Sequence, residues 1–298
     1  MNNILFRPLL LIIAVLFSFP VLAGLGTTES STETGVAESM LQLQTQSGET
    51  GSNTATINQL ASQNAAGLSH LNGVGVEKNE KLAFRWFWRA AEQGYAEAQA
   101  NLGDMYLYGK GVNPNYVEAL KWYQKGAAKN NAKAQYGLYF MYINGFGVRR
   151  DKQQAVEWLQ RSAQGGYPEA QTKLGIMYSS GINVPRIPQQ AAQWLRRAAE
   201  QGDSEAQYHL ARQYAMGIGV DRDFVKSYVW YELAGDACPI ESNPSQCAEF
   251  RESVARVLTP VELQKAAQLA TQLRQKFANS YSVDAVLAQQ ADSDSNNN

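Results

Sequence analysis

The sequence repeats itself with a period of 36 residues. Glycines recur at this spacing at Gly73, Gly109, Gly145, Gly181 and Gly217. Valines recur at Val76, Val112, Val148, Val184 and Val220, and tryptophans at Trp86, Trp122, Trp158, Trp194 and Trp230. A unit of this size cannot bury its apolar face alone, so the period predicts a solenoid in which neighbouring copies cover one another.

Each unit is predicted to contain two helices. In the first helix Ala98, Leu102 and Tyr106 form one apolar stripe, and Gly109 follows the last apolar position, where a helix ends in a left-handed residue. The second helix carries a second stripe formed by Ala119, Trp122, Tyr123 and Ala127. Its N-cap is predicted at Asn79, Asn115, Asp151 and Asp223, and in the fourth unit at Ile187 with Pro188 in the first turn.

The stretch "YGKGV" at 108–112 looks like a phosphate-binding loop, but its context favours a turn. A phosphate loop needs a strand before it and a helix directly after it, whereas here a helix precedes it. The lysine, Lys110, is replaced by Val74, Phe146 or Ile182 in other copies. We therefore assign the glycines to a turn between two helices, where Asn183 replaces the second glycine because asparagine also adopts left-handed conformations.

The two ends of the chain differ from the repeats in composition. Residues 1–23 are predicted to be a signal peptide cleaved near Ala23, with an uncleaved anchor as the alternative. The residue directly after the predicted cleavage site is Gly24 and not a cysteine, which argues against a lipid-anchored lipoprotein. Residues 24–53 have the composition of a disordered linker, and 279–298 that of a disordered acidic tail. We expect a periplasmic or secreted protein with no transmembrane segment after signal removal.

The repeats are predicted over 54–237, and residues 238–278 are predicted to form a cap over the last unit. Cys238 stands where the other second helices end, and it is expected to form a disulfide with Cys247 that closes the loop between them. Two thiols alone do not make a metal site. Two helices follow, and Thr259, Pro260 and Glu262 form a capping-box start for the second.

These residues carry a resemblance to the Sel-one-like repeat family, which is related to the tetratricopeptide repeats. The matching signature is Ala98, Leu102, Gly103, Tyr106, Gly109, Gly111, Val112, Ala119, Trp122 and Ala127. The resemblance covers 62–237 and implies an all-α fold, a right-handed α-α superhelical solenoid with a C-terminal helical cap. It also implies a scaffold or adaptor that binds a protein or peptide in envelope assembly, signalling or host interaction.

The sequence contains little that indicates catalysis. The net charge of −1 gives no basic excess for nucleic acid, and the two histidines, His70 and His209, lie far apart with no HExxH motif. His209 is expected to be a surface residue. We predict no enzyme activity, no metal and no cofactor.

In the related superhelices the first helix of each unit lines the concave groove. By register, this implies a partner-binding site at Asp104, Tyr108, Tyr136, Phe140, Asn144, Thr172, Tyr208 and Arg212. Packing of some of these residues between repeats is the alternative. Two other functions stay open: an envelope sensor of a small ligand or glycan, and a β-lactam-binding hydrolase. The cysteine-rich relatives proposed for the latter carry a disulfide in each repeat, whereas this chain has two cysteines in all.

Overall fold

A computed structural model describes residues 54, 56–235 and 244–280. These residues contain helices and no strand, and the helices belong to one compact unit. After a helix at 56–72 come α2 (Glu80–Glu92), α3 (Ala96–Tyr108), α4 (Tyr116–Ala128), α5 (Ala132–Asn144), α6 (Lys152–Gln164), α7 (Pro168–Ser180), α8 (Pro188–Glu200), α9 (Ser204–Met216), α10 (Phe224–Ala234), α11 (Pro244–Ala255) and α12 (Pro260–Ser280). Among these described helices, none combines the length and the apolar character that a membrane span requires.

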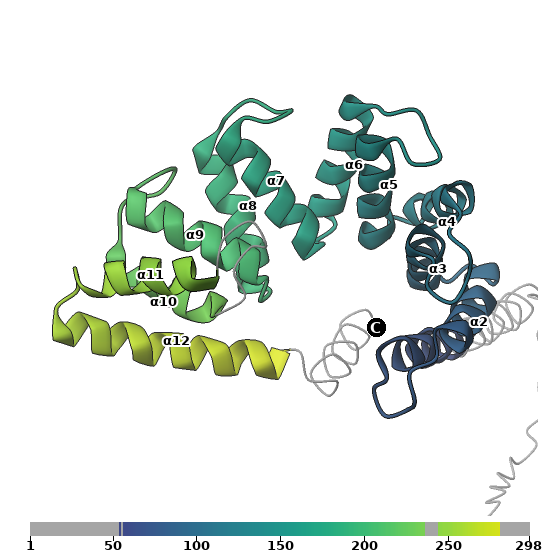
Figure 1. Ribbon diagram of the computed structural model, residues 1–298, viewed down its shortest axis with the longest axis horizontal. Coiled ribbons are helices and arrows are strands. Elements are labelled where there is room, and N and C mark those ends of the chain that lie inside the picture. Colours follow the sequence, from purple (N-terminus) through teal and green to yellow (C-terminus); the bar gives the residue numbers. More distant parts are fainter. Residues whose placement is uncertain (1–53, 55, 236–243, 281–298) are drawn as a thin grey trace, which may run out of the picture. The chain divides into compact units, whose positions relative to one another are not determined.

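Successive helices pack against one another in chain order, which confirms the α-α solenoid (Figure 1). The closest neighbours are the two helices of each unit: α3 with α4, α5 with α6, α7 with α8, and α9 with α10. Each unit then packs on the next through α2 with α3, α4 with α5, α6 with α7, and α8 with α9. The core is therefore a row of clusters along the solenoid, each shared by adjacent units.

The predicted ends of the helices are confirmed. The side chains of Asn79, Asn115, Asp151 and Asp223 each accept a hydrogen bond from a backbone N–H in the first turn of the helix that follows. Gly109, Gly145, Gly181 and Gly217 end the first helices in the left-handed conformation, with φ between 68° and 77°. Asn183 adopts φ 61°, as expected of asparagine in place of the second glycine.

The second glycine of the turn also has a packing role that turn conformation alone does not predict. A Cβ atom at Gly147 would lie 2.7 Å from the carbonyl oxygen of Tyr116, the first residue of α4. Gly111 and Gly219 approach the first residues of α2 and α8 in the same way. In the second, third and fifth units the turn thus lies directly on the start of the preceding unit's second helix, and glycine permits this approach.

The contact between the third and fourth units differs from the others. Here Asn183 occupies the position of the second glycine, and it is exposed. Among the first helices, α3 packs against α5, and α7 against α9, whereas α5 and α7 touch less. The two units therefore meet mainly through α6 and α7.

The second helix of the last repeat ends earlier than predicted. We expected its second helix to end at Cys238, but α10 ends at Ala234, and Gly235 follows with φ 59° and ψ −140°. Beyond it, α11 and α12 cover the open end of the solenoid, and their buried contacts include Cys247, Val254, Ala266 and Ala270. This confirms a helical cap.

The capping box of the final helix is also confirmed. Thr259 Oγ1 and backbone N–H both donate to Glu262, whose own N–H donates back to Thr259 Oγ1. The helix continues to Ser280, so it includes the first two residues of the predicted tail. Cys238, the signal peptide, the linker and the rest of the tail lie outside the described residues, so the disulfide with Cys247 stays a prediction.

The turn contact gives a stability prediction with a built-in control. At Gly75, with φ 71°, an added Cβ would have no atom within 4 Å, whereas at Gly147, with φ 64°, it would lie 2.7 Å from the Tyr116 carbonyl oxygen. We expect Gly75→Ala to cost about 1 kcal/mol through backbone strain, and Gly147→Ala about 2–4 kcal/mol because it adds a clash. Urea unfolding of both variants tests this. Equal losses would show that the turn does not set the spacing of the units.

Candidate functional site

We use the name first-helix face for the side chains that the first helices α3, α5, α7 and α9 leave partly or fully exposed. Four predicted site residues, Asp104, Tyr108, Tyr136 and Phe140, gather around one small cavity of about 120 Å³ between α3 and α5. Tyr123 from α4 and Lys133 from α5 also line this cavity. We call these six residues the tyrosine pocket.

A network of hydrogen bonds fixes the polar side of the tyrosine pocket. The Tyr123 hydroxyl donates to Asp104 Oδ1 at 2.6 Å, and Lys133 Nζ lies 2.6 Å from Asp104 Oδ2. Lys133 Nζ also donates to Asn101 Oδ1, and Asn101 Nδ2 donates to Asn64 Oδ1. The chain of bonds crosses three units, so it holds the charged pair of the pocket in one arrangement.

Two glycines allow Tyr123 to reach Asp104. Tyr123 is 1% exposed, and Cβ atoms at Gly103 or Gly137 would collide with its ring. These glycines come from α3 and α5, so the phenol lies between two first helices and presents its hydroxyl at their junction. Burial, followed by the charge of Asp104, raises the pKa of Tyr123 far above its usual value, so the hydroxyl remains a donor.

Further aromatic side chains pack beside the tyrosine pocket. The Tyr136 ring lies 5.5 Å from that of Tyr139 and 5.3 Å from that of Tyr167, which precedes α7. Burial is the main cause of the raised pKa of Tyr136 and Tyr167, so both phenols stay neutral. At the rim Tyr108 is 58% exposed, with Lys110 Nζ 5.6 Å from its ring centre. The cavity therefore combines a fixed interior with an accessible aromatic edge.

The other four predicted residues differ in their exposure to solvent. Asn144 is exposed at the end of α5, where its amide donates to the Phe140 carbonyl oxygen, and Arg212 is exposed on α9. Thr172 is 2% exposed, and its hydroxyl donates to Asp203 at 3.0 Å. Tyr208 is 5% exposed and packs in the core that joins the last repeat to the cap. For these last two residues the structure therefore shows packing between repeats.

A larger pocket lies between α7 and α9 on the first-helix face. Its volume is about 320 Å³, and its lining includes Ile176, Arg186, His209, Arg212, Gln213 and Met216. We call these residues the arginine pocket. It combines apolar side chains with two guanidinium groups, and no carboxylate is among the described residues that line it.

The expectation that His209 is a surface residue is wrong. Its side chain is partly buried against the Tyr208 ring, with 5.3 Å between ring centres. Burial, and then the charges of Arg212 and Lys173, lower the pKa of His209 to about 4. The imidazole is therefore neutral at pH 7. The equivalent Asn101 and Gly137 are buried, whereas Lys173 is exposed, so burial at this register position differs between units.

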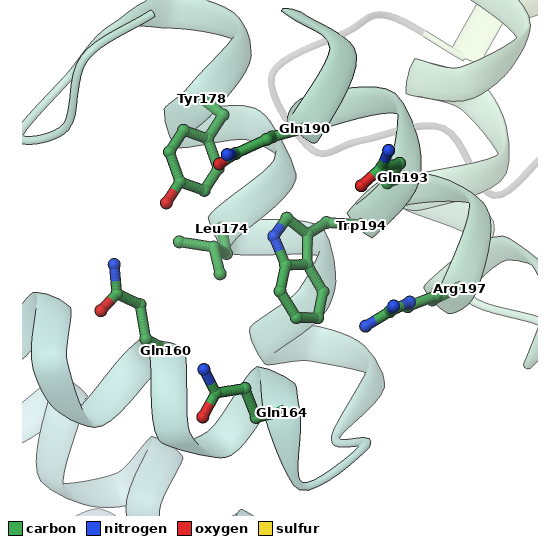
Figure 2. A pocket seen from close by; sticks show the side chains of 8 residues that line it. All are labelled: Gln160, Gln164, Leu174, Tyr178, Gln190, Gln193, Trp194 and Arg197. Carbon is green, nitrogen blue, oxygen red and sulfur yellow. The ribbon is translucent and has the colours of Figure 1, made fainter. Parts of the chain in front are cut away.

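A third hollow opens where the third and fourth units separate. Figure 2 shows Gln160 and Gln164 of α6 opposite Tyr178 of α7 and three residues of α8, Gln190, Gln193 and Trp194. These residues line a cavity of about 320 Å³. We call these six residues the glutamine hollow. The Arg197 guanidinium lies 4.7 Å from the Trp194 ring centre, so its charge is partly engaged by the indole.

Sequence reasoning missed several of these residues, although the repeat register carries a signal for them. Lys133 is the exception at a position that holds Glu97, Glu169 and Glu205 in other units. Gln213 stands where Met105, Met141 and Met177 are buried. Departures from the repeat consensus therefore mark the site better than the helix register alone.

A comparison with known families matches five Sel1 repeats, at 60–95, 96–131, 132–167, 168–203 and 204–237. The chain belongs to the Sel1 repeat family. The matched repeats coincide with the five helix pairs, because each match begins near or at a first helix and ends just before the next. No curated protein matches the chain.

Similar solved structures include other repeat proteins. A Sel1 repeat protein from Oxalobacter formigenes is 35% identical, with a TM-score of 0.57, over 63% of this chain and 54% of that one. A protective antigen present in uropathogenic Escherichia coli strains, displaying an SLR fold, is 27% identical over 78% of this chain and 63% of that one, with a TM-score of 0.35. The matches thus span less than two thirds of either relative's length.

The titration of His209 gives a prediction of stability against pH. Its pKa is about 4 in the fold and 6.5 as the ordinary value, so the unfolded chain binds the proton first as pH falls. The contribution of the neutral imidazole is complete above pH 6.5 and declines toward pH 4, by roughly 1–2 kcal/mol at pH 5. We expect His209→Gln to reduce the change in urea midpoint between pH 7 and 5. An unchanged dependence on pH would contradict burial of the imidazole.

Proposed function

We propose that this Sel1 repeat protein is a scaffold that binds a protein or peptide partner through its first-helix face, centred on the tyrosine pocket. The observation that carries the proposal is the exposed Tyr108 ring beside a cavity whose interior is already ordered. Tyrosine is favoured at the centres of protein interfaces because it offers a large apolar area and a hydroxyl at small entropic cost. Membership of a repeat family whose units present extended surfaces supports this role.

The polar groups of the tyrosine pocket favour binding over acid–base chemistry. Asp104, the carboxylate that lines the pocket, is engaged by both Lys133 and the Tyr123 hydroxyl. An ordered pair of this kind can guide a partner's orientation, since its lone pairs and protons already have defined directions. We therefore propose a non-catalytic adaptor.

We further propose that the protein acts after export, in the periplasm or outside the cell. The support is the sequence of residues 1–23, with a basic residue, an apolar run and small residues before Gly24. A partner of the first-helix face would then be an envelope or extracellular protein.

Site-directed photo-crosslinking tests the proposed surface. A photoreactive residue replaces Tyr108 in the full chain, in the cells that produce it, and the matched control replaces Trp88, an aromatic residue on α2 that is 48% exposed. We expect a discrete adduct from position 108 and none from 88. Phe140→Ala should weaken the adduct at 108, because it removes the apolar wall of the pocket. The same adduct from both positions would contradict the first-helix face as the interface.

A second candidate function rests on the glutamine hollow. Four primary amides, each a donor and an acceptor, surround the Trp194 ring, and this combination suits the hydroxyl groups and apolar faces of a neutral glycan. Gln160→Ala with Gln193→Ala should abolish binding to immobilised neutral oligosaccharides, while Tyr108→Ala should preserve it. Retention of immobilised glycan by the double variant would remove this candidate.

A further inference from the structure

We propose that the arginine pocket captures the C-terminal residue of a partner peptide whose last side chain is apolar. The inference rests on the proposed peptide-binding role of the first-helix face and names the part of the partner that the α7–α9 end of this face recognises. Three features of the pocket support it: a concentration of positive charge, a buried amide without a full set of partners among the described residues, and an apolar wall.

The positive charge of the arginine pocket favours an anionic ligand. Arg186 and Arg212 both line it, and neither forms an ion pair within the described part of the chain. The Arg186 Nε–H donates to the Ser179 carbonyl oxygen at 3.0 Å, which anchors this side chain at the pocket edge. A guanidinium group pairs well with a carboxylate because its N–H groups match the two oxygens.

Gln213 is a polar side chain at a position that is apolar elsewhere. It is 4% exposed, and the three preceding units place Met105, Met141 and Met177 there. Its Nε2 donates to Ser179 Oγ at 3.1 Å, but its Oε1 is buried without a hydrogen-bond partner in the described residues. Such an orphaned carbonyl is unfavourable in the free protein, so a ligand N–H at this wall of the pocket would satisfy it.

The remaining wall is apolar and accessible. Ile176 contributes from α7, and Met216, which is 52% exposed, contributes from the end of α9. Methionine adapts to side chains of different shape because it is flexible and polarizable. A volume of about 320 Å³ suits one or two residues and is too small for a folded segment.

A peptide C-terminus supplies an anion, an N–H donor and an apolar side chain within one residue. Its carboxylate pairs with the arginines, its amide N–H faces the glutamine, and its side chain lies against Ile176 and Met216. An internal aspartate or glutamate supplies the carboxylate but places it where the apolar side chain would lie. The chemistry of the pocket therefore favours a free C-terminal carboxylate on a residue such as leucine or valine.

Fluorescence anisotropy with the full chain tests this inference. The probe is a pool of labelled hexapeptides that end in leucine and are randomised upstream, compared with the same pool carrying a C-terminal amide. We expect the free-acid pool to bind and amidation to weaken binding at least about tenfold, because it removes the charge-assisted hydrogen bonds. Equal binding of both pools would overturn the inference. Equally tight binding of acetate would also overturn it, since the pocket would then recognise a small carboxylate without the amide N–H or the apolar side chain.

Two variants test whether the peptide binds in the arginine pocket. Gln213→Met restores the residue of the other units, so it should fold with at least the parent's thermal stability and bind the free-acid pool more weakly. Arg212→Gln should weaken binding similarly, whereas Arg85→Gln on the exposed side of α2 should not. If both pocket variants bind as the parent does, the inference is wrong.

These outcomes are separable from failure of the proposed function. An adduct at position 108 with no binding of the free-acid pool would leave the first-helix face as an interface and remove the C-terminal pocket. Binding of the pool without an adduct at 108 would support the arginine pocket and remove the tyrosine pocket as the centre of the interface. Absence of both would remove the two proposals together.

Discussion

The structure depends on the contact between each turn and the start of the preceding unit's second helix. The second glycine of the turn combines a positive φ with an approach to a backbone carbonyl that a Cβ atom would block, as at Gly147 and Tyr116. Because this contact recurs at every regular junction, it sets how closely one unit lies on the next. The aromatic and aliphatic core then fills the space that this spacing leaves.

The pockets arise where the repeat is broken. Asn183 replaces a glycine at the junction between the third and fourth units, where the glutamine hollow lies. Lys133 replaces a glutamate and forms the ion pair of the tyrosine pocket, while Gln213 replaces a methionine beside the arginine pocket. Most residues of a repeat protein pack one unit on the next. The side chains that distinguish one pocket from another therefore lie at departures from the consensus sequence.

The sequence predicted the fold more completely than the candidate site. Helix pairs, caps and left-handed turns followed from spacing and local chemistry, and these agree with the structure because they depend on neighbours along the chain. Asp104, Tyr108, Tyr136 and Phe140, which the register of the first helices placed at the candidate site, line one cavity, and their role in binding stays a prediction. The same register failed to separate Tyr208 from them, because burial of that ring depends on α11 of the cap.

The sequence by itself determined the repeating unit, its turns and the family, since each of these is encoded within 36 residues and repeated five times. Only the tertiary structure decided which side chains of the first helices are accessible, that His209 is partly buried, and that Gln213 lines a cavity with two arginines. The reason is that exposure in a solenoid depends on the distance to the next unit. That distance is set by contacts between residues roughly one repeat apart, such as the contact of Gly147 with Tyr116.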